Sequence, residues 1–300
     1  MPAWASLAVL LALALEWTLR EPPERVHPVA WLGRLVAPLD REWRYPGASG
    51  LLVALVVPVL VGGVVYLSVA LAGTAHVAPA SILAGLVLFS SSSLRMLTGS
   101  ASEVVEASEP DPERAREALL ALVGRERDDL SSGEMRSAAI ESAAENLADG
   151  LVAPLLAFGI AANVSLPLAA AAAAWVKAVN TLDSTLGYPD KPHGTASARL
   201  DDLVMFVPAR VASLLLALAA RSPDPLLDAR RWAREPASPN SGWPMGTLAG
   251  ALHVRLEKPG AYVLNPVADL PTVEEARRGV RLVTVAGLLA YLLAGVFAWG

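Results

Sequence analysis

Residues 51–72, LLVALVVPVLVGGVVYLSVALA, are followed after four residues by a second apolar run at 77–94, VAPASILAGLVLFSSSSL. Neither run contains Asp, Glu, Lys or Arg, and His76 is the one potentially charged side chain of the linker between them. A helix needs about 20 predominantly apolar residues to cross a bilayer. This stretch therefore predicts a transmembrane helical hairpin.

Further apolar runs at 3–15, 150–176, 203–220 and 280–299 are also candidate spans. Hydrophobic residues make up 54% of the chain and charged residues 18%, a composition unusual for a water-soluble domain. No basic residue precedes the run at 3–15, which favours a retained first helix over a cleaved signal peptide. We expect one all-α polytopic membrane domain over residues 1–300, with about five or six transmembrane or re-entrant helices.

Two of these runs carry residues that interrupt a simple span. The run at 150–176 contains prolines and Asn163, and the run at 203–220 contains Arg210, where an uncompensated charge is costly. Each run could cross the bilayer or re-enter. A single crossing by 150–176 would place the acidic sequence before it and Lys177 after it on opposite sides of the membrane.

Basic residues indicate the orientation. The segment 20–50 contains Arg20, Arg25, Arg34, Arg41 and Arg44, whereas the linker 73–79 contains no Lys or Arg. Because cytoplasmic loops are enriched in Lys and Arg, we expect 20–50 to be cytoplasmic and the linker external. The polar segments 95–150 and 221–279 are expected on the cytoplasmic side as well, in a multi-pass protein of the cell membrane whose active site opens to the cytoplasm.

Charge and cysteine content exclude several classes of function. A net charge of -5 argues against a nucleic-acid partner, which usually requires a basic surface. The chain has no cysteine, so disulfides, thiolate metal ligands and cysteine nucleophiles are all excluded.

A row of acids precedes the apolar run at 150–176, in the sequence RSAAIESAAENLADGLVAP from Arg136 to Pro154. Ser131 and Glu134 fit a capping box, so a helix should begin there. On a regular helix the acids would share a stripe roughly 80° wide. They are Glu134, Glu141, Glu145 and Asp149. Like charges four residues apart disfavour a helix, so we interpret the row as a site for a divalent cation such as Mg²⁺, with a solvated helix face as the alternative.

A second polar stretch, KAVNTLDSTLGYPDKPHGTASARLDDL, covers residues 177–203. It combines side chains that bind phosphate oxygens with side chains that bind metal ions, as phosphate chemistry requires. These side chains are Lys177, Asn180, Asp183, Arg199, Asp201 and Asp202. A polar interhelical loop is the alternative reading. The sequence contains no GxxxxGK[ST] phosphate loop, so a nucleotide site would need another design.

Two other stretches carry weaker signals. SPNSGWPMGTLAGALHVRLEKPGAY, at 238–262, combines turn residues with small residues suited to close helix packing. HPVAWLGRL, at 27–35, contains His27, which could be a ligand or a base, although a lone histidine is more often structural.

These stretches together resemble one family, the membrane-bound CbiB-type or CobD-type cobalamin biosynthesis proteins, the adenosylcobinamide-phosphate synthases. The resemblance rests on motifs that occur in the family's order. They are HPVAWLGRL at 27–35, ESAAENLADGLVAPL at 141–155, KAVNTLDSTLGY at 177–188, ASARLDDL at 196–203, PAR at 208–210, and SPNSGWP followed by MGTLAGAL at 238–252. The loop YPDKPHGT at 188–195 departs from the family pattern.

The resemblance implies an ATP-dependent ligation. A carboxylate of adenosylcobyric acid would be joined by an amide bond to aminopropanol phosphate, or to a related amino alcohol, giving adenosylcobinamide phosphate. Mg²⁺ and ATP would activate the carboxylate, commonly as an acyl phosphate. The expected partners are the corrinoid, the amino alcohol phosphate, ATP and the lipid bilayer; a homo-oligomer is compatible with the sequence.

Within this reading each polar residue receives an expected role. We expect Glu141, Glu145 and Asp149 to bind Mg²⁺. The expected ligands of phosphates and substrates are Lys177, Asn180, Arg199, Arg210, Asn146 and Asn240. The expected proton acceptors or additional metal ligands are Asp183, Asp201 and Asp202, with His27 as a lesser candidate base.

Two other functions remain open at this stage. A transporter of a corrinoid or phosphate compound would also place acids and lysines among broken helices, and it would be expected to have an internal repeat. A non-catalytic membrane sensor would not require the polar groups to converge.

Overall fold

The computed structural model describes residues 2–19, 25, 27–123, 130–188 and 190–299. Arg20, with the rest of 20–24, residue 26 and residues 124–129 of the expected cytoplasmic segments lie outside this part of the chain, as does Pro189. The described residues are mostly helical, with one two-stranded hairpin. Within them, four helices are long and apolar enough to cross a membrane, or five if the helices joined at Met205 form one broken span. The prediction of an all-α polytopic membrane protein is therefore confirmed.

The chain divides into two compact units, each assembled from separate stretches of sequence. The assignment of residues 1–300 to a single membrane domain stays a prediction. Unit one comprises Met1–Ser93, Ala153–Met205 and Ala290–Gly300. Unit two comprises Leu94–Val152 and Phe206–Leu289.

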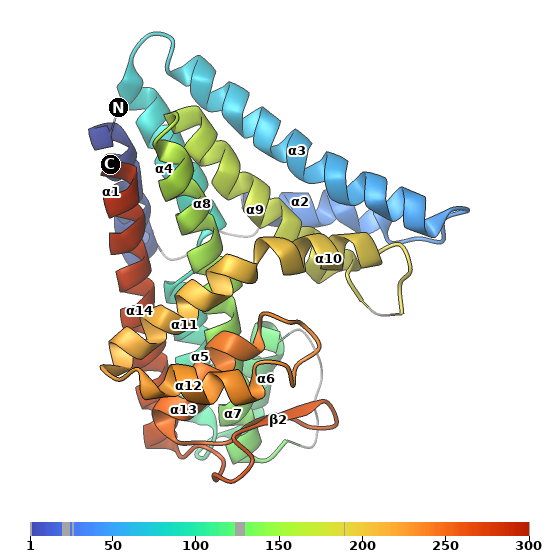
Figure 1. Cartoon of the computed structure of the whole chain (residues 1–300), viewed down its shortest axis with the longest axis vertical. Helices are drawn as coiled ribbons and strands as arrows, with labels where there is room; N and C mark the ends of the chain where they lie inside the picture. Colours follow the sequence, from blue (N-terminus) through green and yellow to red (C-terminus); the bar gives the residue numbers. More distant parts are fainter. Residues whose placement is uncertain (1, 20–24, 26, 124–129, 189, 300) are drawn as a thin grey trace. The chain divides into compact units, whose positions relative to one another are not determined.

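Unit one is a bundle around one central helix, α9 (Leu166–Leu186). The helices α3 (Pro46–Ala72), α4 (Val77–Ser91) and α8 (Ala153–Ala162) pack against α9, and α1 (Pro2–Leu19) packs against α4. Two shorter helices, α2 (Pro28–Val36) and α10 (Thr195–Val204), also contact α9. Figure 1 shows α3 and α4 as the predicted antiparallel hairpin.

The run at 150–176 is not a single span. α8 ends at Ala162, and α9 begins at Leu166 with Ser165 as its N-cap, so the chain reverses between them and α8 packs along α9. Asn163 stabilises the reversal because its Nδ2 donates to the carbonyl oxygens of Gly159 (3.1 Å) and of Phe297 in α14 (2.9 Å). The chain therefore does not cross as one continuous helix over 150–176.

The run at 203–220 is also interrupted. α10 ends at Val204, and α11 (Phe206–Ala220) begins after Met205. The Pro208 and Arg210 that made this run irregular in sequence lie in the first turns of α11.

Unit two contains the acid row. α7 (Ser132–Asn146) packs against α5 (Arg95–Ala107), α6 (Pro112–Val123) and α13 (Gly242–Leu252). α7 continues as a π-helix, η2 (Leu147–Val152), which packs against α11. α12 (Asp224–Trp232) pairs with α13, and most of α14 (Val273–Trp299) belongs to this unit.

The hairpin of unit two lies on α7. Strands β1 (Leu256–Lys258) and β2 (Tyr262–Leu264) pair antiparallel, with Leu256 opposite Leu264 and Lys258 opposite Tyr262. β1 packs against α7, and the backbone N–H of Glu257 donates to Ser137 Oγ over 2.9 Å. Gly260, at the turn, has a φ of +74°, a conformation that favours glycine.

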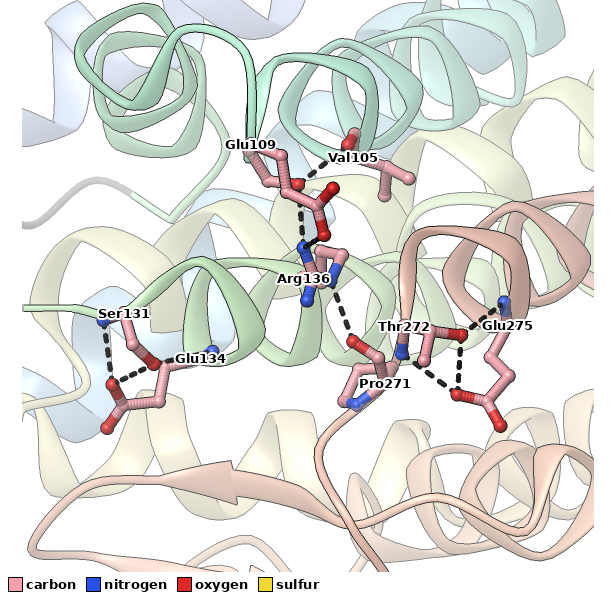
Figure 2. A network of polar contacts seen from close by, with 9 residues as sticks. Val105, Glu109, Ser131, Glu134, Arg136, Pro271, Thr272 and Glu275 are labelled. Carbon is pink, nitrogen blue, oxygen red and sulfur yellow. Dashed lines mark hydrogen bonds and ion pairs between the residues drawn. The ribbon is translucent and has the colours of Figure 1, made fainter.

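Arg136 of α7 joins three segments of unit two (Figure 2). Its Nε donates to the carbonyl oxygen of Pro271 over 2.7 Å, and its Nη1 donates to Ser108 Oγ and Glu109 Oε1, both over 3.1 Å. Arg136 is 8% exposed and Ser108 fully buried. The charged group is therefore stabilised by hydrogen bonds that also fix the approach of α5 and α14 to α7.

Two capping boxes flank this arginine. Ser131 and Glu134 exchange hydrogen bonds at the beginning of α7, which confirms the predicted helix start. Thr272 and Glu275 form the same pattern before α14.

We expect Arg136→Met to lower the free energy of unfolding by about 1.5–3 kcal/mol, because it removes charged hydrogen bonds from buried acceptors. The ion pair itself contributes little of this, since the Glu109 side chain is 63% exposed. Unfolding in mixed micelles with increasing dodecyl sulfate measures the change. Arg116→Met is the matched control, because its partner Glu113 is 84% exposed. This variant should lower the free energy of unfolding by less than about 1 kcal/mol. Equal losses in the two variants would contradict the role of Arg136.

Candidate functional site

Glu141 of the acid row is buried and held by the hairpin. Only 8% of the residue is exposed, and its Oε1 accepts a 2.7 Å hydrogen bond from the hydroxyl of Tyr262. The same hydroxyl lies 3.7 Å from Met245 Sδ of α13. Glu145 follows one turn later on α7 and is half-buried. Two carboxylates therefore share one face of α7, and Tyr262 of β2 contacts the first of them.

A lysine of the hairpin accompanies these acids. Lys258, at the end of β1, lies close enough for its positive charge to attract Glu145. Sequence reasoning assigned no role to Lys258 or Tyr262, because the stretch 238–262 looked like a loop and a helix. The scarcity of lysine, with three in the chain, was the one available signal for Lys258.

The last member of the row, Asp149, does not continue the stripe of a regular helix. The α-helix ends at Asn146, and Asp149 lies in the π-helix, whose wider turn changes the angular spacing of its residues. Among the described residues, no three side chains of His, Cys, Asp or Glu are grouped so that they could hold a metal ion. Mg²⁺ is usually bound by one or two carboxylates together with substrate phosphates and waters. The pair Glu141 and Glu145 fits that pattern, and Mg²⁺ binding by the row stays a prediction.

Asn146 uses its amide within its own helix. Its Nδ2 donates to the carbonyl oxygen of Ser142 over 3.0 Å and to Ser142 Oγ over 3.3 Å. Its Oδ1 is the atom of the amide that these two hydrogen bonds leave unoccupied. A role for Asn146 in substrate binding stays a prediction.

Arg210 and Asn240, both predicted to bind substrate, are in direct contact. Nη1 of Arg210 donates to Asn240 Oδ1 over 2.5 Å and to the carbonyl oxygen of Phe206 over 2.9 Å. The guanidinium also lies 3.9 Å from the ring centre of Phe206 and 5.1 Å from that of Trp243. Arg210 is thus oriented by neighbours on both sides, an arrangement that suits a fixed cation but also explains how α11 is joined to the start of α13.

The polar residues of 177–203 belong to unit one. Lys177, Asn180 and Asp183 lie on α9, as their spacing predicted. The others lie on α10, which packs along α9: Arg199 is exposed, Asp202 half-buried and Asp201 only 7% exposed. These residues belong to a helix pair, although the sequence left open a polar interhelical loop.

Gly187 leaves room for the carboxylate of Asp183. A Cβ at Gly187 would lie 1.9 Å from Asp183 Oδ1, so any larger residue would displace that side chain. The end of α9 is therefore shaped around Asp183. The catalytic roles of Asp183, Asp201 and Asp202 stay predictions.

His27 has a structural role at the beginning of α2. It is the N-cap, and its Nδ1 accepts a 3.2 Å hydrogen bond from the backbone N–H of Val29. In a neutral imidazole with Nδ1 as acceptor, Nε2 carries the proton. His27 would have to give up this cap to act as a base through Nδ1.

An additional cluster, which sequence reasoning missed, fixes the loop after α9. Asp40 accepts from Lys191 Nζ over 2.6 Å and lies 3.2 Å from His193 Nε2. Lys191 also lies 4.6 Å from the ring centre of Tyr188. Gly50 of α3 permits the close approach, since a Cβ there would meet the carbonyl oxygen of His193 at 2.0 Å. Lys191 and His193 therefore anchor the loop to the segment before α3.

Low pH should release this anchor. The hydrogen bond from Lys191 holds the pKa of Asp40 below its usual value of 3.8. Because the folded-state pKa is the lower one, the anchor is fully present above pH 3.8 and is lost as the pH falls through the folded-state pKa. Hydrogen exchange at the amides of Lys191 and Gly194, corrected for intrinsic rates, should accelerate in that range. Asp40→Asn should accelerate it already at neutral pH, and Asp190→Asn, an exposed acid of the same loop, should not. Exchange unaffected by Asp40→Asn would contradict the anchor.

Comparisons with known proteins agree on one family. The family model described as CobD/Cbib protein matches residues 9–291. A probable cobalamin biosynthesis protein CobD from Methanothrix thermoacetophila is 34% identical, covering 96% of this chain and 95% of that protein. The cobalamin biosynthesis proteins CobD of Rhodobacter capsulatus and Klebsiella pneumoniae are 36% and 35% identical, with coverage of at least 96% on both sides. No solved structure matches the chain. A match over nearly the whole length, by the family model and by several relatives, means that the chain belongs to the CobD/CbiB family of cobalamin biosynthesis proteins.

Proposed function

We propose that this protein is an ATP-dependent acid–amine ligase, an adenosylcobinamide-phosphate synthase. It would join a carboxylate of adenosylcobyric acid to the amine of aminopropanol phosphate, or of a related amino alcohol phosphate. Membership of a cobalamin biosynthesis family supports the pathway. The observation that carries the ligase assignment is the buried Glu141 beside Glu145, because paired acids at the edge of apolar sequence suit a cation and its phosphate ligands.

The acids of α7 would hold Mg²⁺ together with the phosphates of ATP. A carboxylate is a poor acyl donor, and ATP with Mg²⁺ would supply its activation. Tyr262 fixes Glu141 through its hydroxyl, and Lys258 balances part of the negative charge near Glu145. In unit two, Arg210 is a second oriented cation for phosphate oxygens, because Asn240 and two aromatic rings hold its guanidinium.

The helix pair α9 and α10 would serve the substrate phosphate and the amine. Lys177 and Arg199 would neutralise phosphate oxygens, with Asn180 as a hydrogen-bonding neighbour. The attacking amine must lose a proton to react, and a carboxylate such as Asp183, Asp201 or Asp202 would accept it. The arginines that precede α3 support an active site that opens to the cytoplasm, since basic residues mark that side of a membrane protein.

The direct test uses the full chain purified in detergent with corrinoid, amino alcohol phosphate and Mg²⁺-ATP. The amide product should form only when all of these are present. Glu145→Gln should lower the rate at least about 100-fold, because it removes a charge on which the transition state depends. It should also raise the Mg²⁺ concentration needed for half-maximal rate. Glu113→Gln, which changes an exposed acid of α6, is the matched control and should retain the full rate.

Other outcomes would favour other functions. Product formation that is undiminished in Glu145→Gln would remove the acid row from the mechanism. Uptake of corrinoid into vesicles without any ATP-dependent amide product would favour a transporter over a ligase.

A further inference from the structure

The outer face of α2 exposes large apolar side chains beside an arginine. On the inner face, Val36 packs in a cluster with α9, and Leu32 packs against that cluster. On the outer face, Trp31 and Leu35 are 49% and 75% exposed, and Arg34 is exposed between them. Exposure of both Trp31 and Leu35 to water would be unfavourable. The face has the composition of a helix that lies in a membrane interface.

The rest of this segment continues the same composition. Arg25, Arg41 and Arg44 are exposed, as is Tyr45. The guanidinium of Arg41 lies 4.3 Å from the ring centre of Trp43, and that of Arg44 lies 5.3 Å from the ring centre of Tyr45. We call the exposed arginine, aromatic and leucine side chains of residues 25–45 the basic aromatic surface.

The charge of the basic aromatic surface is not cancelled by acids of the same segment. Residues 25–45 contain four arginines and two acids. One of the acids, Asp40, already binds Lys191 and His193. The other, Glu42, is opposed by three exposed arginines, Arg25, Arg41 and Arg44, even without Arg34, which has further interactions of its own. The surface therefore complements anionic groups.

The position of this surface along the chain indicates the source of the anionic groups that it would bind. α3 begins at Pro46, directly after the segment, and its exposed residues Leu51, Leu52, Leu55 and Val59 are apolar. α3 is also a candidate span. The basic aromatic surface therefore lies at the end of a lipid-facing helix, the level at which Trp, Tyr and Arg meet lipid headgroups.

The interior contacts of unit one keep the surface at that level. Val53 and Val57 of α3 pack against the cluster that contains Val36 of α2 and Leu182 of α9. Trp31 Nε1 donates to the carbonyl oxygen of Arg25 over 2.9 Å, which ties Arg25, three residues before the start of α2, to the helix. α2 is thus fixed beside the first turns of α3 and presents a preformed face (Figure 1).

We propose that the basic aromatic surface binds the anionic phospholipid headgroups of the leaflet in which α3 begins. The arginines bind headgroup phosphates, Trp31 and Tyr45 lie at the headgroup level, and Leu35 enters the acyl boundary. This interaction is independent of the ligase proposal, because none of these side chains belongs to the residues assigned to the reaction.

Titration of the detergent-solubilised full chain with phosphatidylglycerol, followed by native mass spectrometry, tests the charge selectivity. Phosphatidylcholine is the neutral comparison. Arg41→Gln combined with Arg44→Gln should weaken phosphatidylglycerol binding by roughly fivefold for each arginine removed. Arg230→Gln combined with Arg231→Gln, two exposed arginines at the end of α12, is the control with the same change in charge and should have little effect. Equal affinity for the two lipids, or equal loss in the two double variants, would overturn the proposal.

The absence of cysteine in the chain permits a second test, of depth. A spin label on Leu35→Cys, with the protein in phosphatidylcholine and phosphatidylglycerol nanodiscs, should collide with oxygen more than with a water-soluble nickel complex. A label on Leu60→Cys, exposed on α3, gives the lipid reference, and Glu113→Cys gives the water reference. A label at Leu35 that behaves like the one at residue 113 would refute the membrane contact. An immobile label that neither reagent reaches would indicate that a second copy of the chain covers this face instead.

Discussion

Close packing on the alanine face of α9 is the interaction on which unit one depends. Residues 169–174 are six consecutive alanines, and Ala169, Ala170 and Ala173 are fully buried. Within a bilayer, helices associate through van der Waals contact and hydrogen bonds, and small residues let their backbones approach. A Cβ on Gly62 of α3 would lie 3.3 Å from the carbonyl oxygen of Ala171, which is closer than an ordinary van der Waals contact. The backbones of α3 and α9 therefore approach each other closely at this point. The same packing fixes the polar last turns of α9, which carry Lys177, Asn180 and Asp183.

The features that could be predicted from sequence are local ones. The apolar runs at 51–72 and 77–94 and the capping box at Ser131 depend on neighbouring residues, and they fold as expected. The reversal within 150–176 includes a hydrogen bond from Asn163 to Phe297, a residue 134 positions later, so the sequence indicated an irregularity but could not show its form. The π-helix at 147–152 has no sequence signature that we could recognise, and it displaces Asp149 from the expected stripe.

The candidate site also combines features that the sequence could predict with features that depend on residues far along the chain. Residue types and spacing identified the acids of α7, and they also identified Arg210 and Asn240, which the structure brings into contact. The partners that orient these groups come from far along the chain. Tyr262 is 121 residues from Glu141, and Lys191 is 151 residues from Asp40. Neither pairing has a spacing that one sequence could reveal, and the hairpin that carries Tyr262 and Lys258 is too short to show a strand pattern.

The shared helix α14 affects how the protein is made. Its residues up to Leu289 belong to unit two and those from Ala290 onward to unit one. In unit one it receives hydrogen bonds from Asn163 and from Ser6, near the start of the chain. The ribosome therefore synthesises the earlier helices of both units, from α1 to α13, before the helix that the two units share. Until α14 is made, the earlier helices of each unit lack one of their packing partners, so a quality-control factor that recognises exposed helix faces would find such faces in both units.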